Sequence, residues 1–107
     1  MVSNHGARNI DTLPATIDAL PAIAERVAGR IPVIVDGGIR RGTDVFLKSI
    51  ALGAAAVMIG RPYFYALAVA GSGGVRHCVE LLRREFEMAM ALTGRTSISE
   101  IDRSIIW

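Results

Sequence analysis

The chain has 107 residues, of which 51% are hydrophobic and 21% are charged, and 11 are glycine. This length allows one domain with a modest core, and the composition is too apolar for a disordered segment. The 12 basic and 10 acidic residues are interspersed and give a net charge of +2, so no basic stripe indicates nucleic-acid binding. The high apolar content of so short a chain indicates that it is part of a larger structure.

The single cysteine, Cys78, cannot form an internal disulfide, which indicates a reducing compartment. We therefore expect a cytoplasmic location, with peripheral membrane association left open. No apolar run reaches the roughly 18 residues of a transmembrane segment, and residues 1–5 do not resemble a signal peptide. We find no linker and treat residues 1–107 as one segment.

The first predicted helix covers residues 12–28, where apolar side chains recur at helical spacing and Gly29 provides a stop. Pro21 lacks a backbone N–H, so we expect a break or kink near Leu20. Residues 31–35 form a β-branched run without polar alternation, which predicts a strand buried on both faces.

A second helix is predicted from residue 43 to residue 52, capped by Thr43 or Asp44 and closed by Gly53. The apolar run 54–59 then predicts another buried strand. After it we expect a short helix over 63–70, a flexible break at 71–74, a long helix over 75–93 and a short terminal helix over 97–104.

Buried strands that alternate with helices are typical of a parallel α/β architecture. Val2 runs directly into a polar loop, as though it ended a preceding strand. Functional residues of such folds gather at the carboxyl ends of the strands. Three such ends are visible, at residues 3–8, 36–42 and 60–62.

The second and third strand ends predict a site for a phosphate group. Gly37 and Gly38 allow close approach of the backbone to a ligand, and Arg40 offers a fork of donors to an anion. Gly60 and Arg61 repeat this combination at the next strand end. One such loop alone is better explained by a turn with a solvated arginine, but two in succession favour phosphate.

The first strand end carries His5 and Arg8. Histidine titrates near neutral pH and exchanges protons readily, and an arginine three residues later could hold a substrate carboxylate. Equally, His5 could cap the loop and Arg8 could pair with Asp11. No metal-ligand spacing is present, so we expect no metal site. The aromatic run 63–65 is expected to pack its helix.

Three motifs, residues 3–8, 36–44 and 59–62, resemble the C-terminal part of the FMN-dependent α-hydroxy acid oxidases and dehydrogenases. Glycolate oxidase, lactate oxidase and flavin-dependent L-lactate dehydrogenase belong to this family. The resemblance extends over essentially the whole chain. It implies a TIM (β/α)8 barrel, of which this chain would supply the loop after strand 6 through helix 8. A complete barrel needs about 250 residues.

The resemblance also implies a role for each matching residue. His5 would be the active-site base, and Arg8 would bind the carboxylate of a small L-2-hydroxy acid, which is oxidised to the 2-oxo acid. FMN would be the cofactor, and its expected binding residues are Ser3, Asp36, Gly37, Gly38, Ile39, Arg40, Gly60 and Arg61.

The complete enzyme is expected to form a homo-oligomer, such as a tetramer. The isolated 107-residue chain is expected to be inactive, because its strands cannot close a barrel. The alternative is an inactive α/β module that at most binds FMN or phosphate, or that self-assembles.

Overall fold

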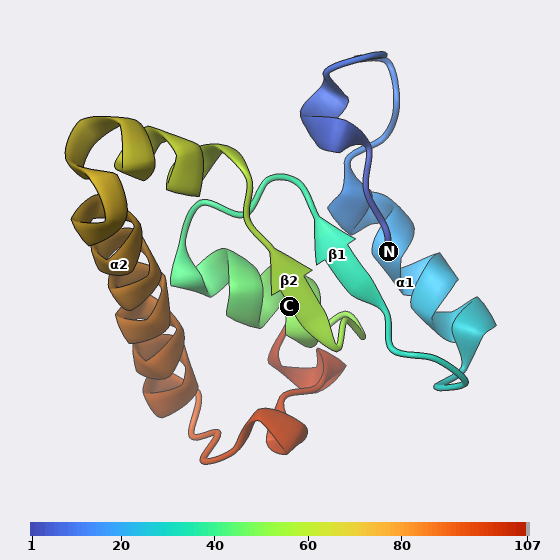
Figure 1. The fold of residues 1–107 in the computed structure, drawn as a ribbon. Coiled ribbons are helices and arrows are strands. Elements are labelled where there is room, and N and C mark those ends of the chain that lie inside the picture. The colour runs from blue at the N-terminus through green and yellow to red at the C-terminus, as the bar shows by residue number, and fades with distance from the viewer. Residues whose placement is uncertain (107) are drawn as a thin grey trace.

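The computed structural model describes residues 1–106, and the side chains of residues 46–48 are left out of its description. Figure 1 shows the arrangement of its two main helices and its small sheet. In chain order the elements are η1 (His5–Ala7), α1 (Thr16–Val27), β1 (Ile34–Asp36), η2 (Asp44–Ile50), β2 (Ala56–Met58), α2 (Arg61–Leu92), η3 (Ile98–Glu100) and η4 (Arg103–Ile105).

The two strands are parallel, as the alternation of helices and strands predicts. Val35 of β1 lies opposite Val57 of β2. On the other side of β1, Val2 forms a parallel bridge with Val35, and its N–H donates to the carbonyl oxygen of Ile34 at 2.7 Å. Val2 therefore pairs with β1 like the last residue of a strand.

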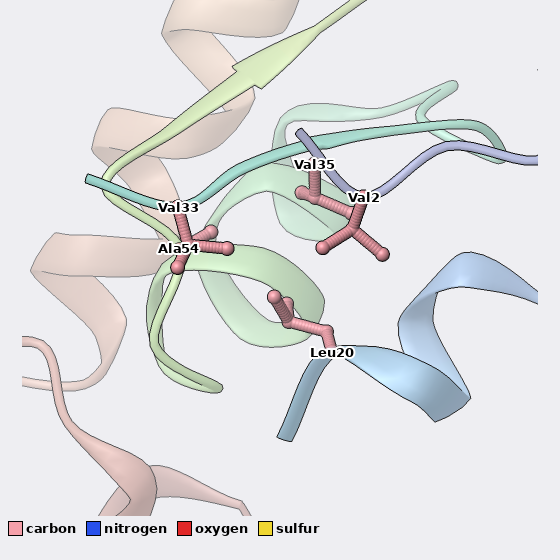
Figure 2. Close-up of a cluster of buried hydrophobic side chains, with 5 residues drawn as sticks. All are labelled: Val2, Leu20, Val33, Val35 and Ala54. Atoms are coloured by element: carbon pink, nitrogen blue, oxygen red, sulfur yellow. The ribbon is translucent and has the colours of Figure 1, made fainter. Parts of the chain in front are cut away.

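The main core lies between this sheet and α1 (Figure 2). Leu20 of α1 is fully buried and Val35 is 1% exposed. Val2, Val33 and Ala54 complete the cluster. Burying an aliphatic side chain of this size contributes about 2 kcal/mol, so the cluster fixes α1 beneath the strands.

Of the break or kink expected near Leu20, the break does not occur, because α1 continues through Pro21. The proline removes one backbone hydrogen bond, but Leu20 is anchored in the core immediately before it. Tertiary packing therefore holds the helix together where local propensity favours a break.

The second predicted helix is a π-helical segment, η2, and Gly53 closes it as predicted, with φ +103° and its N–H donated to the carbonyl oxygen of Ile50 at 2.9 Å. The Asp44 carboxylate accepts hydrogen bonds from the N–H groups of Arg40 and Arg41, at 3.0 and 2.9 Å. It therefore fixes the preceding loop. The buried Ser49 hydroxyl donates to the Asp44 carbonyl oxygen at 3.3 Å, which suits the wider π-helical turn.

The second strand is far less buried than its composition predicts. Ala56 and Met58 are exposed, and the exposed fraction of Met58 is 50%. Among the described residues, β2 pairs only with β1. One edge of this apolar strand is therefore open.

The predicted break after residue 70 is confirmed in position, although it is short. Ala70 and Gly71 leave the helical conformation inside α2, and Gly71 has φ +56°. Residues 72–74 remain helical. The two arms of α2 meet at an angle (Figure 1), and a Cβ at Gly74 would overlap the carbonyl oxygen of Ala66. The bend thus depends on close backbone packing.

The expected terminal helix over 97–104 is wrong, because this segment forms the two short turns η3 and η4. Ile101 lies between them, is 7% exposed and packs with Ala51 and Ala89 in a second cluster. Drawing Ile101 into this cluster interrupts the helix. No helix of the described residues is both long enough and apolar enough to span a membrane.

Candidate functional site

A cleft of about 790 Å³ is lined by residues of η1 and by residues that follow β1 and β2 in the chain. It brings together residues from all three predicted strand-end loops. All but one of the ten residues singled out by the sequence line it, namely His5, Arg8, Asp36, Gly37, Gly38, Ile39, Arg40, Gly60 and Arg61.

The remaining residue, Ser3, is exposed and is not among the residues that line the cleft. Its hydroxyl donates to Oδ2 of Asp36 at 2.8 Å and accepts the N–H of His5 at 3.2 Å. Ser3 therefore links the first loop to the second instead of facing the cleft itself.

His5 sits in a turn of unusual conformation. His5, Gly6 and Ala7 have φ values of +57°, +64° and +61°, a region that costs a non-glycine residue about 1 kcal/mol or more. Both backbone groups of Gly6 are held from outside the turn. The Asn4 side chain accepts the Gly6 N–H at 3.1 Å, and Nη2 of Arg61 donates to the Gly6 carbonyl oxygen at 3.2 Å.

Three of the polar side chains that line the cleft, those of His5, Arg8 and Arg40, are available to a ligand. Within the described part of the chain, no protein group hydrogen-bonds to the imidazole of His5 or to the guanidinium groups of Arg8 and Arg40. In particular, no ion pair joins Arg8 to Asp11, which was the structural alternative for that arginine.

The conformation of the second loop, residues 36–42, depends on two glycines, and a hydrogen bond from α1 fixes its start. Gly37 and Gly38 have φ values of +99° and +78°, which glycine adopts without strain. A Cβ at Gly38 would meet no atom within 4 Å. The Thr16 hydroxyl donates to the Asp36 carbonyl oxygen at 2.6 Å. The loop is therefore fixed by the fold and open towards the cleft.

The structure adds three lining residues outside the predicted strand-end loops: Met58, Phe64 and Tyr65. The expectation that the aromatic run packs its helix is wrong for two of its members, since Phe64 is 57% exposed and Tyr65 is 66% exposed. Their position within one turn of Gly60 and Arg61, at the start of a helix, is the signal that could have revealed them.

The cleft carries three arginines, Arg8, Arg40 and Arg61, and one carboxylate, Asp36. This excess of positive charge suits a ligand with more than one anionic group, such as a phosphate together with a carboxylate. The unengaged imidazole of His5 in the same cleft can accept a proton from a molecule held there. The described residues include no group of three metal-ligating side chains.

Comparisons with known proteins agree with this chemistry. The sequence profile of the FMN-dependent dehydrogenases matches residues 1–107. The chain is 61% identical over 104 residues to a peroxisomal (S)-2-hydroxy-acid oxidase of Oryza sativa subsp. japonica, covering 97% of this chain and 28% of that protein. It is 57% identical over 107 residues to glycolate oxidase 1 of Oryza sativa subsp. indica, covering 100% of this chain and 29% of that enzyme.

Comparison with solved structures also points to FMN-dependent enzymes. A lactate oxidase of Pediococcus acidilactici superimposes with a TM-score of 0.90 at 45% identity, covering 94% of this chain and 28% of that one. The structural neighbours are FMN-dependent TIM-barrel enzymes, and this chain is a partial α/β unit with a parallel sheet of two strands. The chain spans less than a third of the length of these relatives.

The expected cytoplasmic location is wrong, because the rice relative that is 61% identical is named a peroxisomal enzyme. A single cysteine reports only on the absence of an internal disulfide and does not distinguish these compartments.

The resemblance predicted from the three loop motifs is confirmed over the whole chain. FMN, the cofactor expected from those motifs, is the cofactor of the matched family, and one structural neighbour was solved with an FMN adduct. The chain therefore belongs to the FMN-dependent dehydrogenase family.

Proposed function

We propose that this chain supplies the base, the substrate-carboxylate site and the phosphate-binding loops for FMN-dependent oxidation of a small L-2-hydroxy acid. The observation that carries the proposal is the convergence of His5, Arg8, Arg40 and Arg61 on one cleft. They come from three loops that are far apart in the sequence, and no described protein group engages the side chains of the first three.

The cleft suits FMN in both charge and shape. Gly37 and Gly38 leave room for close approach, Asp36 can accept hydrogen bonds from ribityl hydroxyls, and Arg40 and Arg61 would bind the phosphate. Ile39 and Gly60 complete the lining on this side. FMN, once bound, supplies the acceptor for the two electrons that leave the substrate.

The remaining chemistry belongs to two residues of the first loop. Arg8 binds the substrate carboxylate through both arms of its guanidinium and so orients the α-carbon. His5 takes a proton, either from the α-carbon or from the hydroxyl group, as the 2-oxo acid forms. Both routes need an unprotonated imidazole that faces the cleft.

Within a complete enzyme, we propose that this chain forms the segment from the loop after strand 6 through helix 8 of a TIM barrel. We further propose a homo-oligomer, such as a tetramer, and a peroxisomal location like that of the rice relative. The identity of 57% to rice glycolate oxidase over all 107 residues supports small 2-hydroxy acids such as glycolate as substrates.

The test is a chimera in which this chain replaces the matching segment of rice glycolate oxidase, to which it is 57% identical. We expect it to bind FMN and to bleach the bound flavin when glycolate is added without oxygen. His5→Gln should keep the yellow flavin and slow bleaching by about 100-fold or more. His77→Gln, on the exposed surface of α2, should change nothing. Bleaching by the His5 variant at the native rate would refute His5 as the base.

A further inference from the structure

Thr16 is buried, and its hydroxyl has no role in the proposed reaction. It is the first residue of α1, and its side chain is 6% exposed. A threonine at a helix start commonly caps the helix, but α1 has Ala15 at its cap and no capping hydrogen bond from a side chain. The Thr16 hydroxyl donates instead to the Asp36 carbonyl oxygen at 2.6 Å.

Asp36 is thereby held at both of its polar ends. Its carbonyl oxygen accepts from Thr16, and its carboxylate accepts from the Ser3 hydroxyl at 2.8 Å. The same Ser3 oxygen accepts the backbone N–H of His5 at 3.2 Å. A continuous path of hydrogen bonds therefore runs from Thr16 through Asp36 and Ser3 to the residue proposed as the base.

The start of α1 also contacts both loops directly. A Cβ at Gly37 would lie 3.2 Å from the Thr16 hydroxyl oxygen and 3.4 Å from Oδ1 of Asn4. The Asn4 amide in turn donates to the carbonyl oxygen of Pro14 at 3.3 Å. Both loops thus rest on residues 14–16, and α1 is itself anchored by the fully buried Leu20.

We propose that Thr16 is a positioning residue: its hydroxyl fixes Asp36 so that the cofactor loop and the His5 loop keep a common alignment. This inference rests on the proposed function, because it assigns the loop of Asp36 to FMN. It predicts that losing the hydroxyl weakens FMN binding even though Thr16 does not line the cleft of about 790 Å³.

The experiment compares Thr16→Val and Thr16→Ser in the chimera with rice glycolate oxidase, using flavin fluorescence to measure the dissociation constant of FMN. Valine matches threonine in shape and lacks the hydroxyl, so we expect about tenfold weaker FMN binding, the scale of one hydrogen bond. Serine keeps the hydroxyl and should stay within about twofold of the native value. Thr12→Val, at an exposed threonine, is the matched control and should bind FMN normally.

A folded Thr16→Val chimera with native FMN affinity would overturn the inference while leaving the proposed function intact. Equal weakening by valine and serine would also overturn it, because serine keeps the hydroxyl to which the inference assigns the effect. If the valine variant does not fold, the pair Thr16→Ser and Thr16→Ala isolates the hydroxyl in the same way. A native chimera that binds no FMN would refute the proposed function, and this inference with it.

Discussion

Arg61 is the side chain that joins two of the three loops around the cleft. It donates to the Gly6 carbonyl oxygen at 3.2 Å and also lines the cleft next to Gly60. A guanidinium has five N–H donors, so this contact leaves others for a phosphate. Arg61 can therefore hold the turn of His5 and a bound anion at once, which the point charge of a lysine would do less well.

Arg8 allows a test of the substrate site at the level of a single residue. Arg8→Lys keeps the charge and removes the two-pronged geometry, so KM for glycolate in the chimera should rise about 10- to 100-fold. Arg26→Lys, at an exposed position on α1, is the control and should leave KM unchanged. An unaltered KM for the Arg8 variant would exclude it as the group that binds the carboxylate.

The composition of the cleft could be predicted from the sequence because parallel strands bring their carboxyl ends to one edge. Once the strands before residues 36 and 60 are located, Asp36 and Arg61 must lie near each other. The contacts of Thr16 and Asn4 could not be predicted in this way. They depend on how α1 packs beneath the sheet, which places Thr16 against a residue 20 positions away.

At the level of elements, two adjacent glycines near the bend in α2 differ in whether they tolerate a side chain. A Cβ at Gly73 would meet no atom within 4 Å, whereas a Cβ at Gly74 would overlap the Ala66 carbonyl oxygen. Gly73→Ala should therefore stabilise the folded chimera by about 0.5–1 kcal/mol, through higher helix propensity. Gly74→Ala should destabilise it by about 1–3 kcal/mol. Thermal unfolding measures both, and shifts of the same sign would contradict the described bend.

The segment before η3 provides a test of pH dependence. The Glu100 carboxylate accepts from the Thr96 hydroxyl and from the N–H groups of Ser97 and Thr96, and these bonds lower the pKa of Glu100 below its usual value. A lowered pKa in the folded state stabilises the turn above the unfolded pKa, and this contribution is lost as pH falls through the folded value.

We expect the backbone amide signals of Thr96 and Ser97 to shift together between about pH 6 and about pH 3, the range in which carboxylates titrate. Their common midpoint should lie below that of a glutamate in an unstructured peptide. Glu100→Gln should abolish the shift. A midpoint at or above the peptide value would show that the turn does not favour the carboxylate.

The local pattern located both strands and most of the helices, but it predicted a break in α1 and a terminal helix that the structure does not show. Leu20 and Ile101 show why, since both are buried by residues distant in sequence. Burial of Leu20 holds α1 together across Pro21, and burial of Ile101 interrupts the terminal helix. In each case tertiary packing outweighs a preference of the local sequence.

At the scale of the whole molecule, the described sheet is apolar and has an open edge at β2. Met58 of β2 is 50% exposed, and β2 has a hydrogen-bonded neighbour only on the side of β1. Val69 and Leu92 of α2 are 86% and 80% exposed. An open parallel strand with apolar side chains readily pairs with another chain.

These features predict how the isolated chain of 107 residues behaves. It spans 29% of the rice glycolate oxidase that it matches. We expect no measurable oxidation of glycolate or lactate when FMN is added, because a sheet of two described strands cannot close a barrel around the cleft. We also expect self-association through the open edge of β2. Oxygen uptake and light scattering measure the two effects, with the active chimera as control. Steady turnover by a monomer would show that the three loops suffice for catalysis without the rest of a barrel.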